Sequence, residues 1–219
     1  MKPRLLDLFC GAGGASMGYH RAGFDVVGVD IVSQPNYPFE FIQADAMTFP
    51  LEGFDVIHAS PPCKLFTVAR RVAQAAAPVL FDPHPDLLAP TRSKLQASGL
   101  PYVIENVPGA PIRHPVVVCG SAFGLEVRRH RLFESNHSLD GSGCRHDLQP
   151  HPVGVYGNGG AWTRTAPGGG GVKVAGADAA RALGIDWTTR QPELAQAIPP
   201  AYTEFIGAQL LEHLKEKAA

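Results

Sequence analysis

Short apolar runs alternate with stretches of helical periodicity through the first part of the chain, residues 1–134. Apolar, β-branched runs that finish in a polar residue are typical of buried parallel strands. They predict strands over residues 5–10, 26–31, 39–44, 55–60, 102–105, 116–119 and 131–134. Helices are predicted over residues 15–23 and 86–97, with a glycine at or just after each end. Alternating strands and helices predict an α/β fold with a parallel, doubly wound sheet.

The pattern changes after about residue 135. Residues 136–177 are rich in Gly, Pro and His and include four successive glycines at 168–171, which predicts an inserted, loop-rich segment. Periodicity returns over residues 178–183, and a last amphipathic helix is predicted over 200–217. We therefore divide the chain into a core (1–134), an insertion (135–177) and a C-terminal part of the core (178–219).

Composition and charge narrow the class of protein. A net charge of −1 in 219 residues gives no global electrostatic argument for nucleic acid, although basic residues cluster locally at Lys64, Arg70 and Arg71 and again over residues 128–131. With no signal peptide and no apolar run long enough to cross a membrane, we expect a cytoplasmic protein without a membrane partner. The four cysteines are then expected to be reduced thiols.

One cysteine has an unusual position. Pro61 and Pro62 end the strand predicted over 55–60, and Cys63 follows them directly. This places Cys63 near the carboxyl edge of the sheet, where open α/β folds bind their ligands. Position alone leaves open the alternative that Cys63 is a small buried hydrophobe.

A glycine-rich loop, Gly11-Ala12-Gly13-Gly14, joins the first predicted strand to the first helix. Glycines at such a turn let backbone amides approach a ligand closely. Asp30 and Asp45 end the next two strands, where carboxylates can accept hydrogen bonds from a ribose and an adenine, although either alone could be a cap or turn residue. Because the loop lacks the Gly-Lys-Ser/Thr of phosphate-binding loops, the pattern favours a nucleoside ligand without phosphates, such as S-adenosylmethionine.

Four motifs occur in the order found in the DNA cytosine-5 methyltransferases, and the sequence resembles that family. They are Asp7-Leu8-Phe9-Cys10-Gly11-Ala12-Gly13-Gly14, Ser60-Pro61-Pro62-Cys63, Glu105-Asn106-Val107 and Arg129-His130-Arg131. The resemblance covers residues 5–133 and, more weakly, 183–211. It implies a Rossmann-like S-adenosylmethionine-dependent methyltransferase fold with a mixed seven-stranded sheet. It also implies a small single-domain enzyme, of the kind that phages and prophages carry, with a short target-recognition insertion.

The resemblance also implies a mechanism and residue roles. Cys63 would add to carbon 6 of a flipped-out cytosine, so that carbon 5 can accept a methyl group. Glu105 would hydrogen-bond the ring, and Arg129 and Arg131 would hold the base carbonyl, the acid or phosphates. The implied cofactor-binding residues are Asp7, Phe9, Gly11, Gly13, Gly14, Asp30, Ile31, Asp45, Pro62 and Gln196, and the implied substrate-binding residues are Lys64, Asn106 and Arg128.

The sequence departs from the family pattern at several positions. Lys64 follows the nucleophile where Gln is usual, and Val127 also replaces a common Gln. The segment that normally closes over the cofactor reads Ala-Gln-Ala-Ile-Pro-Pro over residues 195–200. Gln196 could therefore contact the cofactor differently, and a transferred group other than plain methyl stays open.

The insertion is short for a region that reads DNA sequence. Its aromatic and basic residues, Tyr156, Trp162, Arg164 and Lys173, suffice for phosphate contacts and a few base edges. His137, Cys144 and His146, with Cys119 as a further partner, are weak candidates for zinc ligands. Because their spacing matches no finger pattern, we expect no metal.

The sequence thus predicts a monomeric enzyme that methylates carbon 5 of cytosine in DNA. Two alternatives remain: an enzyme of the same fold that acts on RNA or on free nucleotides, and a non-catalytic DNA-binding relative. The retained cysteine, acid and arginines argue against the second. A restriction–modification system, protection of phage DNA and gene regulation are all compatible with the sequence.

Overall fold

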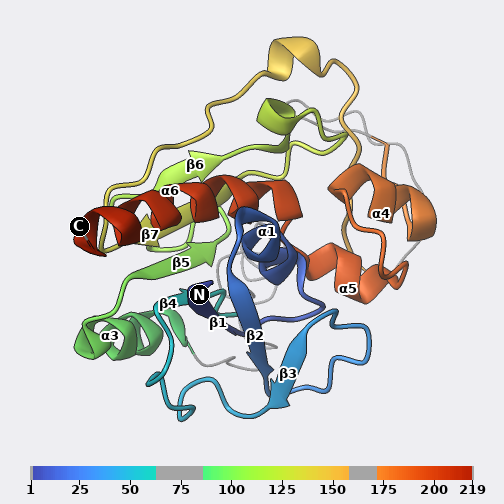
Figure 1. Cartoon of the computed structure of the whole chain (residues 1–219). Helices are drawn as coiled ribbons and strands as arrows, with labels where there is room; N and C mark the ends of the chain where they lie inside the picture. Colours follow the sequence, from blue (N-terminus) through green and yellow to red (C-terminus); the bar gives the residue numbers. More distant parts are fainter. Residues whose placement is uncertain (1, 63–85, 158–171, 219) are drawn as a thin grey trace, which may run out of the picture.

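In the computed structural model, which describes residues 2–62, 86–157 and 172–218, seven strands form one sheet at the centre of the molecule (Figure 1). The strands are β1 Arg4–Leu8, β2 Asp25–Asp30, β3 Glu40–Gln43, β4 Val56–Ala59, β5 Tyr102–Asn106, β6 Val116–Val118 and β7 Arg131–Ser135. Their order is β3-β2-β1-β4-β5-β7-β6. β1 to β5 pair in parallel, whereas β7 is antiparallel to both of its neighbours. The mixed sheet implied by the family resemblance is therefore confirmed.

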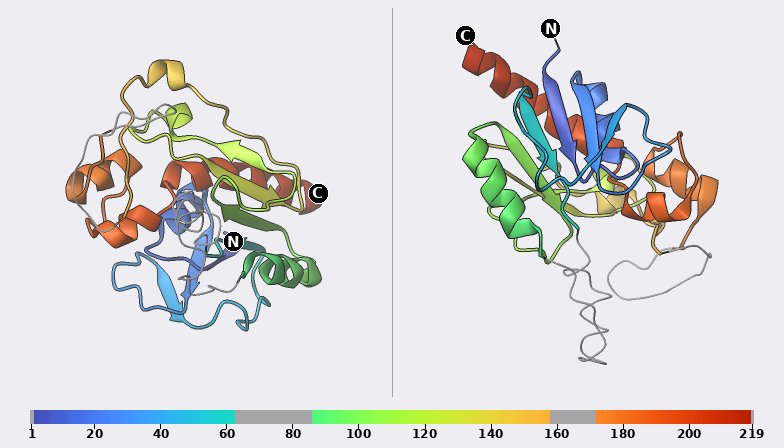
Figure 2. Two further views of the ribbon diagram at one scale, coloured as in Figure 1. Left: turned by 180° about the vertical axis from the view of Figure 1, so that it is seen from behind. Right: turned by 90° about the horizontal axis from the view of Figure 1, so that it is seen from below.

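Helices cover both faces of the sheet (Figure 2), and side chains that alternate along β1 pack against different helices. Leu5 packs with α1 (Gly14–Ala22) and α6 (Pro200–Ala218) on one face. Leu6 and Leu8 pack with α3 (Leu88–Ser98) on the other. Burial on both faces is what the apolar composition of β1 requires, since a parallel central strand exposes neither side to water.

The insertion and the C-terminal segment share a third apolar cluster. Val127 and Val155 pack there against α4 (Gly176–Leu183) and α5 (Gln191–Gln196). Two short 3₁₀ helices, η1 (Gly120–Phe123) and η2 (His146–Leu148), flank β7 in the sequence. Residues on both sides of the predicted division at residue 177 thus form one packed unit beside the carboxyl ends of the strands.

Candidate functional site

The glycine-rich loop turns from β1 into α1 through an unusual backbone. Phe9, Gly11 and Gly13 have φ values of 60°, 51° and 86°, all in the left-handed region. Gly13 is also the N-cap of α1, and a Cβ there would lie 2.8 Å from Cδ of Pro38. Glycine at position 13 is therefore required by both conformation and space. The loop brings the N-terminus of α1 to the carboxyl edge of the sheet.

Asp7 lies beneath this loop, fully buried in β1. Its Oδ2 accepts a hydrogen bond from the hydroxyl of Ser16, which also hydrogen-bonds the Tyr37 hydroxyl at 2.7 Å. Burial raises the pKa of Asp7 to about 7, and the negative charges of Asp30 and Glu105 act in the same direction. Oδ1 of Asp7 has no hydrogen-bond partner among the described residues. It is available to a donor or a positive charge from a ligand.

Asp30 fixes the glycine-rich loop as well as ending β2. Its two carboxylate oxygens accept hydrogen bonds from the backbone N–H of Gly11 (3.0 Å) and of Val32 (2.9 Å). The next side chain, Ile31, is 67% exposed, which is unusual for isoleucine and gives this edge an apolar surface. Asp45, after β3, accepts a hydrogen bond from the N–H of Met47 at 2.8 Å, the turn role that the sequence left open.

The segment that leads into the predicted nucleophile is fixed by Asn106. The Asn106 side chain is 1% exposed and donates through Nδ2 to the carbonyl of Pro61 at 3.0 Å. Its Oδ1 accepts from the N–H of Val107 at 2.9 Å. Pro62 is exposed at the end of the described segment. Cys63 and Lys64 lie outside the described residues. The resemblance implied that Asn106 binds the substrate. In the structure, its side chain holds the backbone of Pro61.

Glu105 ends β5 as a buried acid, 6% exposed. Its Oε1 pairs with Nε of Arg131 at 2.9 Å, and it is hydrogen-bonded by the Ser60 hydroxyl. Burial raises the pKa of Glu105, while Arg131, Ser60 and Arg129 oppose the rise. The structure thus brings Glu105 and Arg131 together with Ser60, the residue just before the two prolines.

A buried hydrogen-bond chain supports Ser60. Tyr19 of α1 contacts Nδ1 of His58 at 2.9 Å, and Nε2 of His58 contacts the Ser60 hydroxyl at 2.8 Å. Burial lowers the pKa of His58 to about 3, so the ring is neutral. Because the neutral ring has one N–H, one of its nitrogens donates and the other accepts; a Ser60 hydroxyl that donates to Glu105 would accept from Nε2–H of His58, with Tyr19 donating to Nδ1. The chain fixes the Ser60 hydroxyl for the acid.

The arginines of the basic group have separate partners. Arg129, at φ 37°, donates from Nε, Nη1 and Nη2 to the carbonyls of Ala197 (3.0 Å), Val155 (3.1 Å) and Ala195 (2.6 Å). Burial lowers the pKa of Arg129 to about 9, and the charge of Arg131 adds to the effect. Arg128 donates to the Gln149 carbonyl at 3.0 Å. Arg129 thus joins the insertion to the end of α5, while Arg131 alone pairs with the acid.

The C-terminal segment packs over the glycine-rich loop. Nε1 of Trp187 donates to the carbonyl of Ala12 at 2.8 Å. Glu193 in α5 accepts hydrogen bonds at 3.1 Å from Asn36, between β2 and β3. A Cβ on Gly14 would lie 2.3 Å from the Ile198 carbonyl oxygen, so Gly14 permits this close packing. Gln196, the last residue of α5, is exposed beside this segment.

A second group of polar side chains comes together from the segments that precede and follow β7 in the sequence. The ligand atoms of Cys119, His130, Cys144 and His146 all lie within 4.8 Å of one another. His137 is elsewhere: its ring packs against His213, with centroids 3.7 Å apart. Cys144, His146 and Cys119, which the sequence suggested as weak metal candidates, therefore come together. The fourth member of the group is His130, which the sequence did not suggest as a ligand.

Several residues of the site were not assigned from the sequence. Ser60 and His58 precede the two prolines on a strand that ends at the ligand edge, and that position is a usable signal. Ser16, Trp187 and the ligand position of His130 depend on long-range packing that no local pattern encodes.

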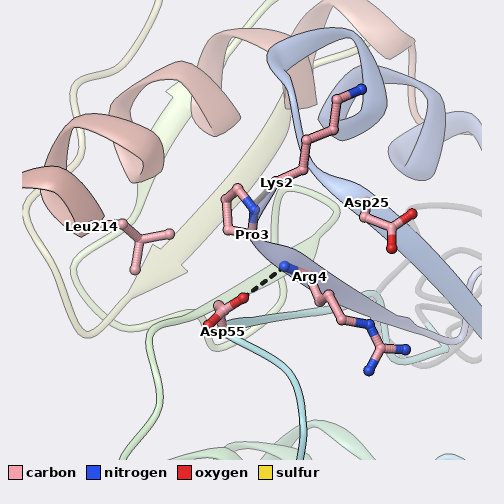
Figure 3. A pocket seen from close by; sticks show the side chains of 6 residues that line it. All are labelled: Lys2, Pro3, Arg4, Asp25, Asp55 and Leu214. Atoms are coloured by element: carbon pink, nitrogen blue, oxygen red, sulfur yellow. Dashed lines mark hydrogen bonds between the residues drawn. The ribbon is translucent and has the colours of Figure 1, made fainter. Parts of the chain in front are cut away.

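A separate pocket lies where β1 and β2 begin, and none of the site residues described above lines it (Figure 3). It is lined by Lys2, Pro3, Arg4, Asp25, Asp55 and Leu214. Arg4 and Asp25 begin β1 and β2, so the pocket lies at the amino ends of the parallel strands. Ligands of open α/β sheets bind at the carboxyl ends, which favours the edge that carries the glycine-rich loop.

Several solved structures share this fold. A proposed DNA modification methyltransferase encoded within an E. coli prophage has a TM-score of 0.64 at 16% identity, covering 98% of this chain and 100% of that chain. The methyltransferase EhMeth of Entamoeba histolytica has a TM-score of 0.60 at 13% identity, covering 100% of this chain and 99% of that chain. The Dnmt2 methyltransferase of S. pombe has a TM-score of 0.58 at 13% identity, covering 98% of this chain and 99% of that chain. No protein-family model and no curated protein matches the sequence.

At these identities the likeness shows the fold. The chain has the Rossmann-like fold of these methyltransferases, as the sequence predicted. The helices of the described residues include none with both the length and the apolar character that a membrane span needs.

Proposed function

We propose that this protein transfers a methyl group from S-adenosylmethionine to carbon 5 of cytosine in DNA. The observation that carries the proposal is the group around Glu105. A buried acid, paired with Arg131 and bonded by Ser60, lies at the strand end beside the segment that leads into Cys63. This group adjoins a glycine-rich loop on a methyltransferase fold.

The residues at the glycine-rich loop fit a nucleoside cofactor. Open space surrounds Gly11, Ile31 offers an exposed apolar surface, and Oδ1 of Asp7 lacks a partner among the described atoms. Residues 7–14 contain no lysine or arginine, which disfavours a phosphate ligand. S-adenosylmethionine, when bound, supplies an electrophilic methyl group. Asp7, Asp30 and the loop amides would hold it, with Trp187 and Glu193 fixing the segment that encloses them.

Cytosine needs activation because carbon 5 is a poor nucleophile. The thiolate of Cys63 would form a bond to carbon 6, and the electron pair displaced into the ring makes carbon 5 nucleophilic. After carbon 5 is methylated it loses its proton, and the bond from Cys63 to carbon 6 breaks. Asn106, by holding the Pro61 carbonyl, would fix the direction in which the chain presents Cys63.

Glu105 would stabilise the charge that develops on the ring. A carboxyl can donate a hydrogen bond to ring nitrogen 3 only while it carries a proton, and burial raises the pKa of Glu105 toward that state. Arg131 and Ser60 limit the rise, so the group can accept and release the proton. Arg129, which donates to three backbone carbonyls, is proposed as a positioning residue rather than a direct contact to the base.

DNA is the proposed partner because the motifs resemble those of DNA cytosine-5 methyltransferases; a cytosine inside a duplex would have to leave the helix to reach Cys63. RNA, free cytosine nucleotides and a modified methyl group remain alternatives that the short insertion and the altered segment around Gln196 allow. The role in restriction–modification or phage protection rests on the sequence resemblance alone.

Mass spectrometry of nucleosides from a host without its own cytosine-5 methylation tests the proposal. DNA from cells that express the protein should contain 5-methyldeoxycytidine, and DNA from cells that express Cys63→Ala should not. Calorimetric binding of S-adenosylmethionine to both proteins controls for folding of the variant. A different cytosine adduct would refute plain methyl transfer. Unmodified DNA with a soluble protein that binds S-adenosylmethionine would refute the DNA substrate.

A further inference from the structure

Four side chains from three separate parts of the chain converge beside β7. Cys119 precedes η1, His130 precedes β7, Cys144 lies two residues before η2, and His146 is the first residue of η2. Sγ of Cys119 lies 3.4 Å from Nε2 of His146, and Sγ of Cys144 lies 3.3 Å from Nε2 of His130. All four ligand atoms lie within 4.8 Å of one another. The lone pairs of two sulfurs and two nitrogens therefore face one small volume.

The two sulfur–nitrogen distances match those of a tetrahedral metal site. Zinc bonds of about 2.3 Å to sulfur and about 2.0 Å to nitrogen, at tetrahedral angles, separate a sulfur from a nitrogen ligand by about 3.5 Å. The two observed sulfur–nitrogen distances are 3.4 Å and 3.3 Å. Two thiolates and two imidazoles form a ligand set typical of structural zinc. We propose that Cys119, His130, Cys144 and His146 bind one structural zinc ion.

The surroundings support thiolate ligands. The Ser121 hydroxyl lies 3.1 Å from Sγ of Cys119 and accepts a hydrogen bond from the N–H of Arg145 at 3.0 Å, which leaves its proton for the sulfur. The N–H of Cys119 donates to the Ser142 hydroxyl at 3.1 Å. These contacts hold the ligand segments in place, as outer-shell hydrogen bonds do in zinc sites.

The ion would have a structural task because the protein supplies all four ligands. It would attach the start of the insertion, through Cys144 and His146, to the end of β6 and the start of β7. His130 lies between Arg129, which holds the end of α5, and Arg131, which pairs with Glu105. Zinc on His130 would therefore fix the backbone from which both arginines project.

The experiment measures zinc in the full-length protein purified from zinc-supplemented culture with reductant and without chelators. About one zinc per chain is expected for a closed four-ligand site. Cys144→Ser and His146→Ala should each lose zinc, and both replace side chains that are not buried, so the fold is expected to survive. His151→Ala, an exposed histidine of the same insertion, is the matched control and should keep zinc. Ser121→Ala should weaken zinc binding roughly 10- to 100-fold.

Cobalt substitution gives a second readout that is independent of any enzymatic activity. The Co²⁺ protein should show the intense visible bands of a tetrahedral site and thiolate charge transfer, and both should disappear in Cys144→Ser. Less than one zinc in ten chains, a bound metal other than zinc, or a Cys119–Cys144 disulfide in the reduced preparation would each overturn the proposal. Cys63→Ser should keep its zinc, which separates this test from the proposed methyl transfer.

Discussion

Replacing Arg131 with methionine tests the electrostatics of the proposed site. Arg131 is the ion-pair partner of Glu105, at 2.9 Å, and both side chains are largely buried. Methionine keeps much of the apolar volume but removes the charge that holds down the pKa of Glu105. Glu105 in Arg131→Met must therefore remain as an uncompensated buried anion or bind a proton.

Protonation of Glu105 sets an upper limit on the stability that Arg131→Met loses. Protonating a carboxyl of ordinary pKa 4.5 costs about 1.4 kcal/mol per pH unit, hence about 3 kcal/mol at pH 7 and about 2 kcal/mol at pH 6. Breaking a buried ion pair by removing one partner typically costs about 3–5 kcal/mol, so protonation is the cheaper outcome near neutral pH. The electrostatic destabilisation of Arg131→Met should accordingly be at most about 3 kcal/mol at pH 7.

The sign of the pH dependence follows from the raised pKa. Between the unfolded pKa and the folded pKa, the native state holds a proton that the unfolded state lacks, so the free energy of unfolding falls as pH rises. Loss of Arg131 raises the folded pKa further and extends this window upward. The stability difference between wild type and Arg131→Met should therefore grow from pH 6 to pH 8, by up to about 1.4 kcal/mol per unit, until the new pKa is passed.

Urea unfolding followed by far-UV circular dichroism at pH 6, 7 and 8 measures this. The control is the double variant Glu105→Gln/Arg131→Met, in which the ionisable group is gone and the extra pH dependence should disappear. The reasoning is refuted if Arg131→Met loses the same stability at all three pH values, or if the double variant keeps the slope.

Three further changes have defined outcomes. Asp7→Asn should remove a loss of stability that wild type shows as pH rises from about 4 to about 7, measured by urea unfolding; an unchanged profile would contradict the raised pKa of Asp7. Asn106→Ala should cost about 1–3 kcal/mol of stability in thermal unfolding, because it releases Pro61. It should also lower kcat by more than the loss of folded protein accounts for; a kcat that falls only in proportion to the folded fraction would argue against a positioning role. Arg92→Met should cost up to about 3 kcal/mol at pH 7 in thermal unfolding, by the same protonation limit, because it leaves Glu134 buried without its ion-pair partner; adding Glu134→Gln to Arg92→Met should restore part of the loss.

The strands could be predicted from the sequence to within one or two residues at most ends, because the central ones are buried on both faces and leave long apolar runs. That the sheet is mixed came only from the family resemblance, and nothing in the sequence identified β7 as the antiparallel strand, since an apolar run does not encode strand direction. The six residues of α5 and the 3₁₀ turns were missed because they are too short to show periodicity.

The sequence identified many residues of the candidate site but few of the contacts that they make. Glycines and strand-end acids have local signatures, and the structure places Asp7, Asp30 and Glu105 at one edge of the sheet. The four basic and His residues over 128–131 look alike in sequence, yet Arg129 binds carbonyls of α5 whereas Arg131 binds the acid. The direction of the Arg129 side chain depends on its left-handed backbone and on carbonyls as far as 68 residues away, whereas Arg131 meets an acid on the neighbouring strand of the sheet.

The covalent step at Cys63 is the central claim, and trapping it tests the account most directly. Duplex DNA of random sequence, with 5-fluorodeoxycytidine in place of deoxycytidine, keeps the adduct because carbon 5 then has no proton to lose. Incubation with S-adenosylmethionine followed by peptide mass spectrometry should find methylated fluorocytosine attached to Cys63, and no adduct in Cys63→Ser. Methylation of ordinary DNA without any adduct at Cys63, or an adduct that persists in Cys63→Ser, would contradict the account.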